Sequence, residues 1–385
     1  MNYFLTEDQE MIKDLARQIA EEKFKPIRAE MDEKDEFPWE LVEVLRASDM
    51  FGIYLPEEYG GLGGGVMELC LAVEEMSRVC GGMSLFLAAT ALASFPILLF
   101  GSDEQKQKYL PDLASGKHLA AFALTEPDSG SDAGATKTTA VKDGDNYILN
   151  GTKCFITNGS VADIVTVIAM TDKSRGSRGA SAFIVEKGME GFSVGKEEEK
   201  MGIRASSTSE LIFEDCKVPK ENLISREGMG FIVAMKTLDQ SRPGVASQAL
   251  GIAQGALDAA VEYARQRKQF DRPIITFQGL RWILADMATR VEATRALVYS
   301  VARAVDAGEK RIAKDSAICK LFASDTAMSV TTDAVQIFGG YGYMKEYPVE
   351  KMMRDAKITQ IYEGTNQIQR DVIGTQLVRE SASRK

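Results

Sequence analysis

The residues best suited to chemistry lie near the C-terminal end of the chain, in the segment 357–370, which reads KITQIYEGTNQIQR. Here Glu363 follows an isoleucine and a tyrosine and precedes Gly364, a residue type that allows backbone and ligand to approach closely. Thr365 is a suitable N-cap for a final helix. A carboxylate at such a junction projects into the cavity that the junction borders. On local grounds alone, however, a glutamate beside a helix start is usually a capping or dipole-facing residue.

Histidine offers little chemistry in this sequence, because His118 is the only histidine in 385 residues. Ser-His-Asp or Cys-His catalysis could use no other residue, and the common zinc sites would lack most of their imidazole ligands. His118 stands between Lys117 and an apolar run that begins at Leu119, which predicts the end of a loop at the start of a strand. We therefore expect no metal site, and if the protein is an enzyme we expect its base to be a carboxylate.

Composition limits the possible partners. The chain is too long for one simple core, so two or three domains are expected, and 45% hydrophobic with 26% charged residues is typical of a globular protein. The formal net charge of -10 argues against nucleic acids and anionic membrane surfaces, which need concentrated Lys and Arg. Any phosphate on a ligand must then be bound by a few local groups.

The expected location is a reducing cytoplasm. The five cysteines have no CxxC spacing, which predicts neither a disulfide framework nor a zinc cluster. The first residues, MNYFLTEDQEM, lack the features of signal and transit peptides, so no export is expected. The apolar run 84–100 is short and contains Pro96, which predicts a buried helix and no membrane insertion.

Periodicity divides the chain into helices, then strands, then helices again. In the first part a capping box at Thr6 opens a helix, and further helices are expected at 38–48, 66–79, 84–100 and 103–116. The middle hundred residues contain short β-prone segments between turn signals, at 119–125, 147–150, 164–170, 182–186 and 210–214. Long, Ala-rich helices are expected at 231–267, 276–307, 312–338 and 366–380, as in a helical bundle packed by small residues.

Five motifs occur in order on this framework: TEPDSGSD at 125–132, FITNG at 155–159, RKQF at 267–270, QIFGGYGY at 336–343 and IYEGTNQIQR at 361–370. With the helix, β, helix order they resemble the acyl-CoA dehydrogenase flavoprotein family over essentially the whole chain, and most closely its short-chain, butyryl-CoA-type bacterial members. The resemblance implies an α+β fold with an N-terminal α-helical domain (1–117), a middle antiparallel β domain (118–227) and a C-terminal four-helix bundle (228–385). It also implies a homotetramer in which a neighbouring subunit completes each active site.

FAD is implied to lie between the β domain and the C-terminal helices. Residues of the β domain would line the flavin, namely Phe122, Leu124, Thr125, Gly130 and Ser131, and on another edge Phe155, Ile156 and Thr157. The diphosphate and adenosine would be reached across a subunit interface by Arg267, Gln269, Phe270, Gln278, Gln336, Ile337, Phe338, Gly339 and Gly340. Thr365 and Gln367 would complete the flavin contacts. On local grounds the glycine-rich motifs are also compatible with simple turns and a helix stop.

For an acyl-CoA substrate the family pattern implies contacts from Ser131, Asp239, Arg242, Tyr362 and Gly364. Glu363 would remove the α-proton while the β-hydride passes to flavin N5, giving a 2-enoyl-CoA. In the family a backbone N–H beside this glutamate and a ribityl hydroxyl of FAD hold the thioester carbonyl, which stabilises the developing enolate. Without the resemblance, Asp239 and Arg242 would be interpreted as a solvent-exposed ion pair on a helix.

Branch-specific positions narrow the expected substrate. Some family branches carry the base immediately before the arginine of the long helix, where this chain has Ser241, which cannot act as a base at neutral pH. The resemblance therefore assigns the base to Glu363. Glutaryl-type relatives place an arginine near the start of the helix expected at 84–95, but no arginine occurs in 79–174, so we expect an uncharged acyl group that is straight, branched or alicyclic. Asp271 is a departure, because the family normally has glycine after RKQF.

Three functions remain open from the sequence. The first is an acyl-CoA dehydrogenase that passes electrons to an electron-transferring flavoprotein. The second is an enoyl-CoA reductase that runs the same step backwards within a flavoprotein complex. The third is a non-enzymatic, nucleic-acid-binding relative of the fold, which would want a basic C-terminal extension, whereas this chain stops at Lys385 and is acidic overall.

Overall fold

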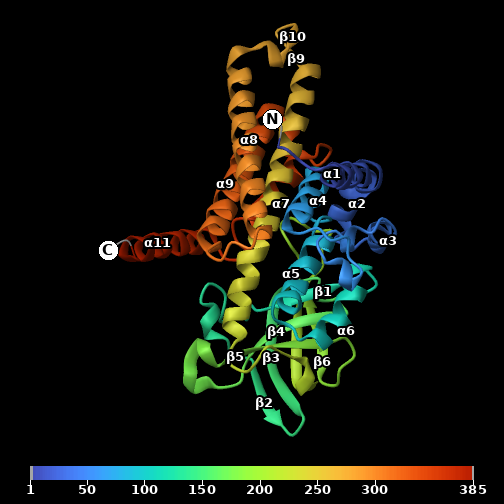
Figure 1. Ribbon diagram of the computed structural model, residues 1–385. Coiled ribbons are helices and arrows are strands. Elements are labelled where there is room, and N and C mark those ends of the chain that lie inside the picture. The colour runs from blue at the N-terminus through green and yellow to red at the C-terminus, as the bar shows by residue number, and fades with distance from the viewer. Residues whose placement is uncertain (1–2, 384–385) are drawn as a thin grey trace.

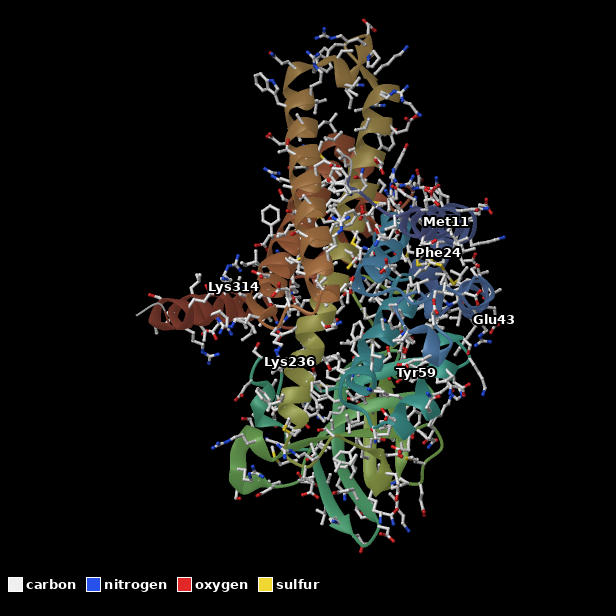
Figure 2. The ribbon with its side chains drawn as sticks, in the orientation of Figure 1. Met11, Phe24, Glu43, Tyr59, Lys236 and Lys314 are labelled. Atoms are coloured by element: carbon white, nitrogen blue, oxygen red, sulfur yellow. The ribbon has the colours of Figure 1, made fainter. Side chains whose placement is uncertain are left out.

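The computed structural model describes residues 3–383 and has three parts that follow the order of the sequence (Figure 1). The first part is helical, with α1 (Glu7–Ile19), α2 (Lys25–Lys34), α3 (Trp39–Ala47), α4 (Val66–Val79), α5 (Leu85–Phe100) and α6 (Asp103–Ala114). The predicted capping box is present, because the Gln9 backbone N–H donates to Thr6 Oγ1 at 3.2 Å. Phe24 lies inside this part, whereas Met11 and Glu43 lie on its surface (Figure 2).

The middle part is an eight-stranded sheet with the order β6-β7-β3-β2-β4-β5-β8, in which β1 pairs with β4. Its strands are β1 (Ala120–Ala123), β2 (Thr139–Asp143), β3 (Asn146–Thr157), β4 (Ile164–Met170), β5 (Ala180–Glu186), β6 (Phe192–Glu197), β7 (Thr208–Pro219) and β8 (Leu223–Ile224). Most pairs are antiparallel, as predicted. β1 and β4, however, are parallel, with Ala120 opposite Ile164, and β2 also meets β4 in parallel. This detail corrects the expected antiparallel domain. β3 brings the chain back to the end of the sheet where β2 begins, so β4 starts there and runs in the same direction as β2.

The third part consists of α7 (Gly230–Gln266), α8 (Gln278–Asp306), α9 (Ala313–Phe338), α10 (Val349–Ile358) and α11 (Asn366–Ser383). A short hairpin of β9 (Lys268–Gln269) and β10 (Arg272–Pro273) joins α7 to α8. In Figure 1, α7, α8 and α9 form a long column with this hairpin at its free end, and α11 extends sideways from the column. The sequence did not predict α10, which packs against α7 and α9.

Helix α7 runs from the sheet into the column and packs closely on α4 of the first part (Figure 1). A Cβ atom at Gly251 would lie 2.2 Å from the Glu74 carbonyl oxygen, and one at Gly255 would lie 2.0 Å from the Arg78 carbonyl oxygen. Only glycine allows the backbones of α4 and α7 to approach this closely. The small residues in these helices therefore allow close helix packing, as the composition of the helices predicted.

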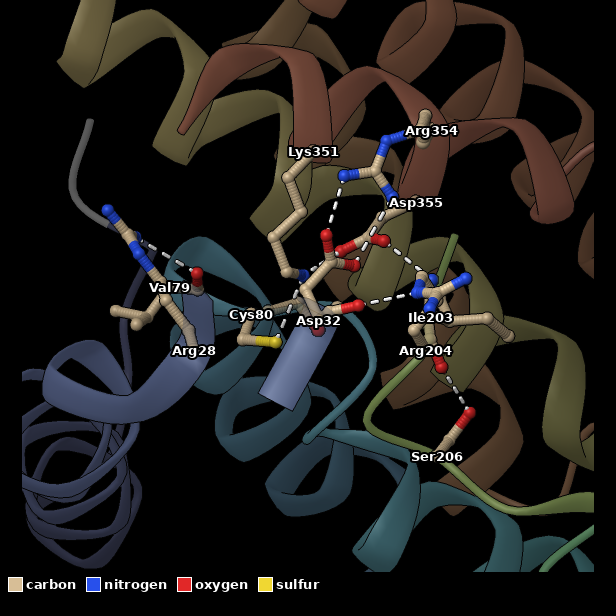
Figure 3. A network of polar contacts seen from close by, with 12 residues as sticks. Arg28, Asp32, Val79, Cys80, Ile203, Arg204, Ser206, Lys351, Arg354 and Asp355 are labelled. Carbon is tan, nitrogen blue, oxygen red and sulfur yellow. Dashed lines mark hydrogen bonds and ion pairs between the residues drawn. The ribbon is translucent and has the colours of Figure 1, made fainter. Parts of the chain in front are cut away.

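A largely buried polar network joins all three parts (Figure 3). Arg354 of α10 donates to the Asp32 carboxylate of α2 at 2.6 Å. The Asp355 carboxylate, also on α10, accepts the Ile203 backbone N–H at 2.6 Å from the segment between β6 and β7, and it pairs with Lys351. Apolar side chains from all three parts form one continuous core, and a smaller core lies within the sheet. The three parts therefore hold the region between them in a fixed geometry.

The apolar run 84–100 forms α5 and is buried, as predicted. Phe95 and Ile97 are almost fully enclosed, and the helix continues through Pro96. It packs against α7 and β1. Within residues 3–383 no helix has both the length and the apolar character needed to cross a membrane.

Candidate active site

A cavity of about 470 Å³ lies where the sheet, α5, α7 and the turn before α11 meet. Helix α5 contributes Leu85, Ala88, Ala89, Leu92 and Phe95 to its lining. Helix α7 contributes Phe231, Met235, Leu238, Ser241, Arg242, Gly244, Val245 and Gln248, and the turn contributes Tyr362, Glu363 and Gly364. A concave, mostly apolar site with few polar groups is typical of sites that bind small organic ligands.

The backbone of the turn determines how Glu363 is presented. Glu363 and Gly364 both have left-handed φ angles, of 53° and 91°. The φ of Gly364 favours glycine, and a Cβ atom there would also lie 2.7 Å from Gln369 Nε2. The N-cap role falls to Thr365, whose hydroxyl accepts the Ile368 backbone N–H at 3.3 Å. The alternative interpretation of Glu363 as a helix cap therefore does not hold.

One oxygen of the Glu363 carboxylate is anchored and the other is not. The Ser241 hydroxyl donates to Oε2 at 2.6 Å, whereas Oε1 makes no hydrogen bond within residues 3–383. The backbone N–H groups of Glu363 and Gly364 also have no hydrogen-bond acceptor within residues 3–383. Beside the cavity there are thus an unoccupied carboxylate oxygen, which could accept a proton, and backbone donors, which could bind a carbonyl oxygen.

The surroundings of Glu363 change its proton affinity in opposing directions. Burial raises the pKa of Glu363, and this effect exceeds the lowering by the Ser241 hydrogen bond and by the positive charges of Arg242 and Lys320. Next to it, the Tyr362 hydroxyl donates to the Gln248 side-chain oxygen. A buried carboxylate with a raised pKa is a better proton acceptor than an exposed one.

Arg242 and Asp239 form a buried ion pair, with Nη1 and Oδ1 3.1 Å apart and exposed fractions of 4% and 8%. This differs from the exposed pair that their spacing alone indicates. Arg242 lines the cavity, and its Nε has no hydrogen-bond partner among the residues described. Asp239 lies beside Arg242 without lining the cavity. Nε is itself enclosed, but Nη2 also makes no hydrogen bond within residues 3–383 and is not enclosed, so the guanidinium retains a donor for a polar ligand.

All the β-domain residues predicted to line the flavin also line this cavity: Phe122, Leu124, Thr125, Gly130, Ser131, Phe155, Ile156 and Thr157. Phe155 has a φ of 58° and is 64% exposed between buried neighbours. The hydroxyls of Thr125, Ser131 and Thr157 make no side-chain hydrogen bond within 3–383, and a Cβ atom at Gly130 would meet nothing within 4 Å. An exposed aromatic ring, free hydroxyls and open backbone fit a planar heterocycle with polar edges, such as the isoalloxazine of FAD.

A buried ion pair behind this surface fixes its main loop. Lys153 is fully buried and donates to the Leu124 carbonyl at 2.9 Å and to the Glu126 carboxylate at 2.7 Å. The same carboxylate accepts the backbone N–H groups of Lys137 at 2.6 Å and Thr138 at 3.0 Å. Burial lowers the pKa of Lys153 to about 8, against the charge of Glu126. This pair positions the segment that carries Thr125, Gly130 and Ser131.

The other residues predicted to bind FAD do not line this cavity. A second, more open hollow, at the hairpin end of the column, is lined by Arg267, Gln269, Ile337, Phe338, Gly339 and Gly340, among others. Phe270, Gln278, Gln336, Thr365 and Gln367 line neither hollow, and Phe270 is 88% exposed. Asp271 adopts a φ of 60°, a conformation that glycine would adopt at lower cost. The chain therefore does not bring these two groups of predicted residues together in one hollow.

Sequence reasoning missed several residues of the site. Ser241 was considered only as a base that the chain lacks, yet its hydroxyl anchors Glu363. Gln248, Lys153 and Lys320 carried no motif, and each is buried with a polar partner from a distant segment. A polar residue in an otherwise apolar stretch, such as Lys320 in AICKLFA, was the one available signal.

Family models match three successive segments of the chain. The N-terminal domain of acyl-CoA dehydrogenases matches residues 6–117, the middle domain matches 121–216 and the C-terminal domain matches 228–378. Among curated relatives, a short-chain specific acyl-CoA dehydrogenase of Clostridium acetobutylicum is 53% identical over 98% of this chain and 100% of its own. The acryloyl-CoA reductase (NADH) of Anaerotignum propionicum is 50% identical over 98% of this chain and 96% of its own.

Two solved structures are similar over nearly the same length. Butyryl-CoA dehydrogenase from Megasphaera elsdenii is 50% identical with a TM-score of 0.96, covering 98% of this chain and 100% of that one. A chain from the structure described as the electron transferring flavoprotein of Acidaminococcus fermentans is 56% identical, also with a TM-score of 0.96 and with coverages of 98% and 100%.

The chain belongs to the acyl-CoA dehydrogenase family. Members of this family are FAD flavoproteins and oxidoreductases that act on CH–CH donors. The family, the fold class, the enzyme class and the FAD cofactor predicted from the sequence are thereby confirmed. The non-enzymatic interpretation is set aside.

Proposed function

We propose that this enzyme dehydrogenates a short, uncharged acyl-CoA to the 2-enoyl-CoA, with Glu363 as the base that takes the α-proton. The observation that carries the proposal is the Glu363 carboxylate, which lines the cavity with Oε2 held by Ser241 and Oε1 unpaired. The free N–H groups beside it support binding of the thioester carbonyl, whose oxygen gains charge as the α-proton leaves. FAD supplies the hydride acceptor when bound.

The lining of the cavity supports the proposed class of acyl group. Its charged side chains are Asp132, Arg242 and Glu363, and α5 contributes only leucine, alanine and phenylalanine. A distal carboxylate on the acyl chain would have no cation on α5 to pair with, and an unpaired buried charge is unfavourable. For the CoA part we propose contacts from Ser131, Asp239, Arg242, Tyr362 and Gly364. Because Asp239 does not line the cavity, it would contact CoA only if its ion pair with Arg242 breaks on binding, and it would otherwise orient Arg242.

We further propose that the working form is a homotetramer in the cytoplasm. The second hollow is lined by Arg267, Gln269, Gly339 and Gly340, which would reach the FAD of a neighbouring subunit. Phe270 and the other residues predicted for the diphosphate and adenosine would lie beside them.

The proposed boundaries of the three domains are 1–117, 118–227 and 228–385. All five cysteines are buried and free, which supports a reducing location.

An electron-transferring flavoprotein is the proposed redox partner, and the similarity to a chain in the Acidaminococcus fermentans structure supports it. The reverse reaction, enoyl-CoA reduction, is the second candidate. It is favoured by the 50% identity to an acryloyl-CoA reductase. The same carboxylate would then return a proton to the α-carbon, so the site itself is compatible with both directions.

The test replaces Glu363 with glutamine, which keeps size and polarity but cannot accept the proton. Glu363→Gln is expected to keep FAD and to bind acyl-CoA, while anaerobic flavin reduction slows by several orders of magnitude. Glu186→Gln, the same change outside the cavity, is the matched control and should reduce normally. Near-normal flavin reduction in Glu363→Gln would show that Glu363 is not the base.

The substrate class is tested by a screen of straight, branched, alicyclic and carboxylated acyl-CoAs with the native enzyme. The direction of the reaction is tested by adding 2-enoyl-CoA to the reduced enzyme.

A further inference from the structure

A buried lysine lies behind the turn that presents Glu363. Lys320 of α9 has no exposed surface, and its ammonium donates to the Gly364 carbonyl at 2.8 Å and to Asn366 Oδ1 at 3.1 Å. Within residues 3–383 it forms no ion pair with a carboxylate inside 4 Å. A buried ammonium bound only by neutral oxygens is uncommon, because desolvation of the charge is not offset by an opposite charge in contact.

The same face of α9 holds the rest of the turn. One helical turn after Lys320, the Ser324 hydroxyl donates to Asn366 Oδ1 at 3.1 Å, and the Asn366 amide donates to Asp325 Oδ1 at 2.8 Å. From α11, the Gln369 amide donates to the Gly364 carbonyl at 2.9 Å. These contacts hold the turn through Gly364 and Asn366, and through no atom of the Glu363 side chain. The Glu363 carboxylate therefore contacts only the Ser241 hydroxyl by hydrogen bond within residues 3–383 and otherwise borders the cavity.

The turn needs such support because its conformation is strained. A left-handed φ at Glu363 is unfavourable for a residue with a side chain, and such a conformation persists only where surrounding contacts hold it. Without these contacts the turn could relax and rotate the carboxylate away from the cavity. The Lys320 hydrogen bond to the next carbonyl is therefore placed to maintain the geometry of Glu363.

The charge of Lys320 also acts on Glu363. The titratable and charged groups that face this pair are Arg242 and Asp239 from α7, Asp325 from α9, Tyr362 from the turn and Arg370 from α11. Asp239 pairs with Arg242, and Asp325 pairs with Arg370 at 3.1 Å. Burial lowers the pKa of Lys320 to about 7, while the charge of Glu363 raises it. Lys320 is therefore the cation near Glu363 whose charge no contacting carboxylate offsets.

We propose that Lys320 is a positioning residue for Glu363, which holds the strained turn through the Gly364 carbonyl and favours the ionised carboxylate through its charge. This inference rests on the proposed role of Glu363 as the base. It separates two contributions of one side chain, a hydrogen bond and a charge, and suitable substitutions can distinguish them.

The experiment compares Lys320→Gln, which keeps an N–H donor but removes the charge, with Lys320→Met, which removes both. Loss of a nearby positive charge favours the protonated carboxyl, so the acid limb of anaerobic flavin reduction by butyryl-CoA should move to higher pH in both variants. Below the limb, the rate should fall about tenfold for each pH unit of displacement. Above the limb, Lys320→Gln should approach the native plateau, and Lys320→Met should remain slower because the turn has lost its support.

Lys351→Gln is the matched control, because Lys351 is also buried but pairs with Asp355 away from the cavity. It should lower thermal stability and leave the acid limb in place. An unmoved limb in both Lys320 variants, with Glu363→Gln inactive, would overturn this inference while the proposed base stands. If the native enzyme is not reduced, or Glu363→Gln is reduced normally, the proposed function fails instead. Loss of folded flavoprotein in both Lys320 variants would also overturn the inference, since it would assign Lys320 to stability.

Discussion

Removal of the Ser241 hydroxyl should make Glu363 harder to ionise. Ser241 donates to Glu363 Oε2 at 2.6 Å, and a hydrogen bond to a carboxylate stabilises the charged form more than the protonated one. In Ser241→Ala this stabilisation is lost, so the pKa of Glu363, already raised by burial, should rise further. The carboxylate would then be ionised over a narrower range of pH.

The size of the effect follows from the type of bond. A hydrogen bond to a charged group contributes about 1.5–3 kcal/mol, and one pKa unit corresponds to about 1.4 kcal/mol. We take the lower end, because the Glu363 side chain borders the cavity, where water can replace some of the lost interaction. The acid limb of flavin reduction should therefore move up by about one pH unit, with a rate about tenfold lower below the limb.

The assay is anaerobic stopped-flow reduction of the flavin by a short acyl-CoA across a series of pH values. Ser247→Ala is the control, since Ser247 is a buried serine on the same helix whose hydroxyl donates at 2.8 Å to the Gly244 carbonyl. The control should keep the native limb. If Ser241→Ala also keeps it, the hydrogen bond does not set the ionisation of Glu363 and the reasoning is refuted.

Two further predictions concern the framework of the site. Gly364→Ala should lower the free energy of unfolding by about 1–3 kcal/mol and slow flavin reduction, because the new Cβ would meet Gln369 in a left-handed backbone; urea denaturation and stopped-flow reduction check this, and native values in both would contradict it. Asp355→Asn should cost about 3–5 kcal/mol, because Lys351 is left buried without its counter-charge. Denaturation measures this cost, and a loss below about 1 kcal/mol would show that the pair contributes little.

The sequence predicted the fold where periodicity and burial coincide. The helix expected at 66–79 and the strand expected at 164–170 match α4 and β4 residue for residue. β2 and β6 were missed because most of their side chains are exposed and polar, so no apolar alternation marks them. The strand expected at 147–150 extends to Thr157 as β3, past a register shift near Gly151 that interrupts the pattern.

The site was predictable only through the motifs that resemble the family. On local grounds Glu363 is compatible with a helix cap and Arg242 with an exposed ion pair, so neither residue type alone indicated a site. The roles of Ser241 and Lys320 were not predictable, because they depend on contacts with residues 122 and 44 positions away in sequence. The position of Lys320 in an apolar stretch was the one available signal. The left-handed conformation of Glu363 was also invisible, since nothing in its residue type requires a positive φ.

The position of Glu363 explains why so many groups converge on it. In the proposed role Glu363 must bind protons more tightly than an exposed carboxylate does, and burial raises its pKa. Burial also disfavours the ionised form that a base requires. The pKa of Glu363 is lowered by the hydrogen bond from Ser241 and by the positive charges of Arg242 and Lys320, which lie on α7 and α9. The balance between these effects depends on how α7, α9 and the turn are arranged, and the hydrogen bonds from Ser241 to Glu363 and from Lys320 to the Gly364 carbonyl join the three.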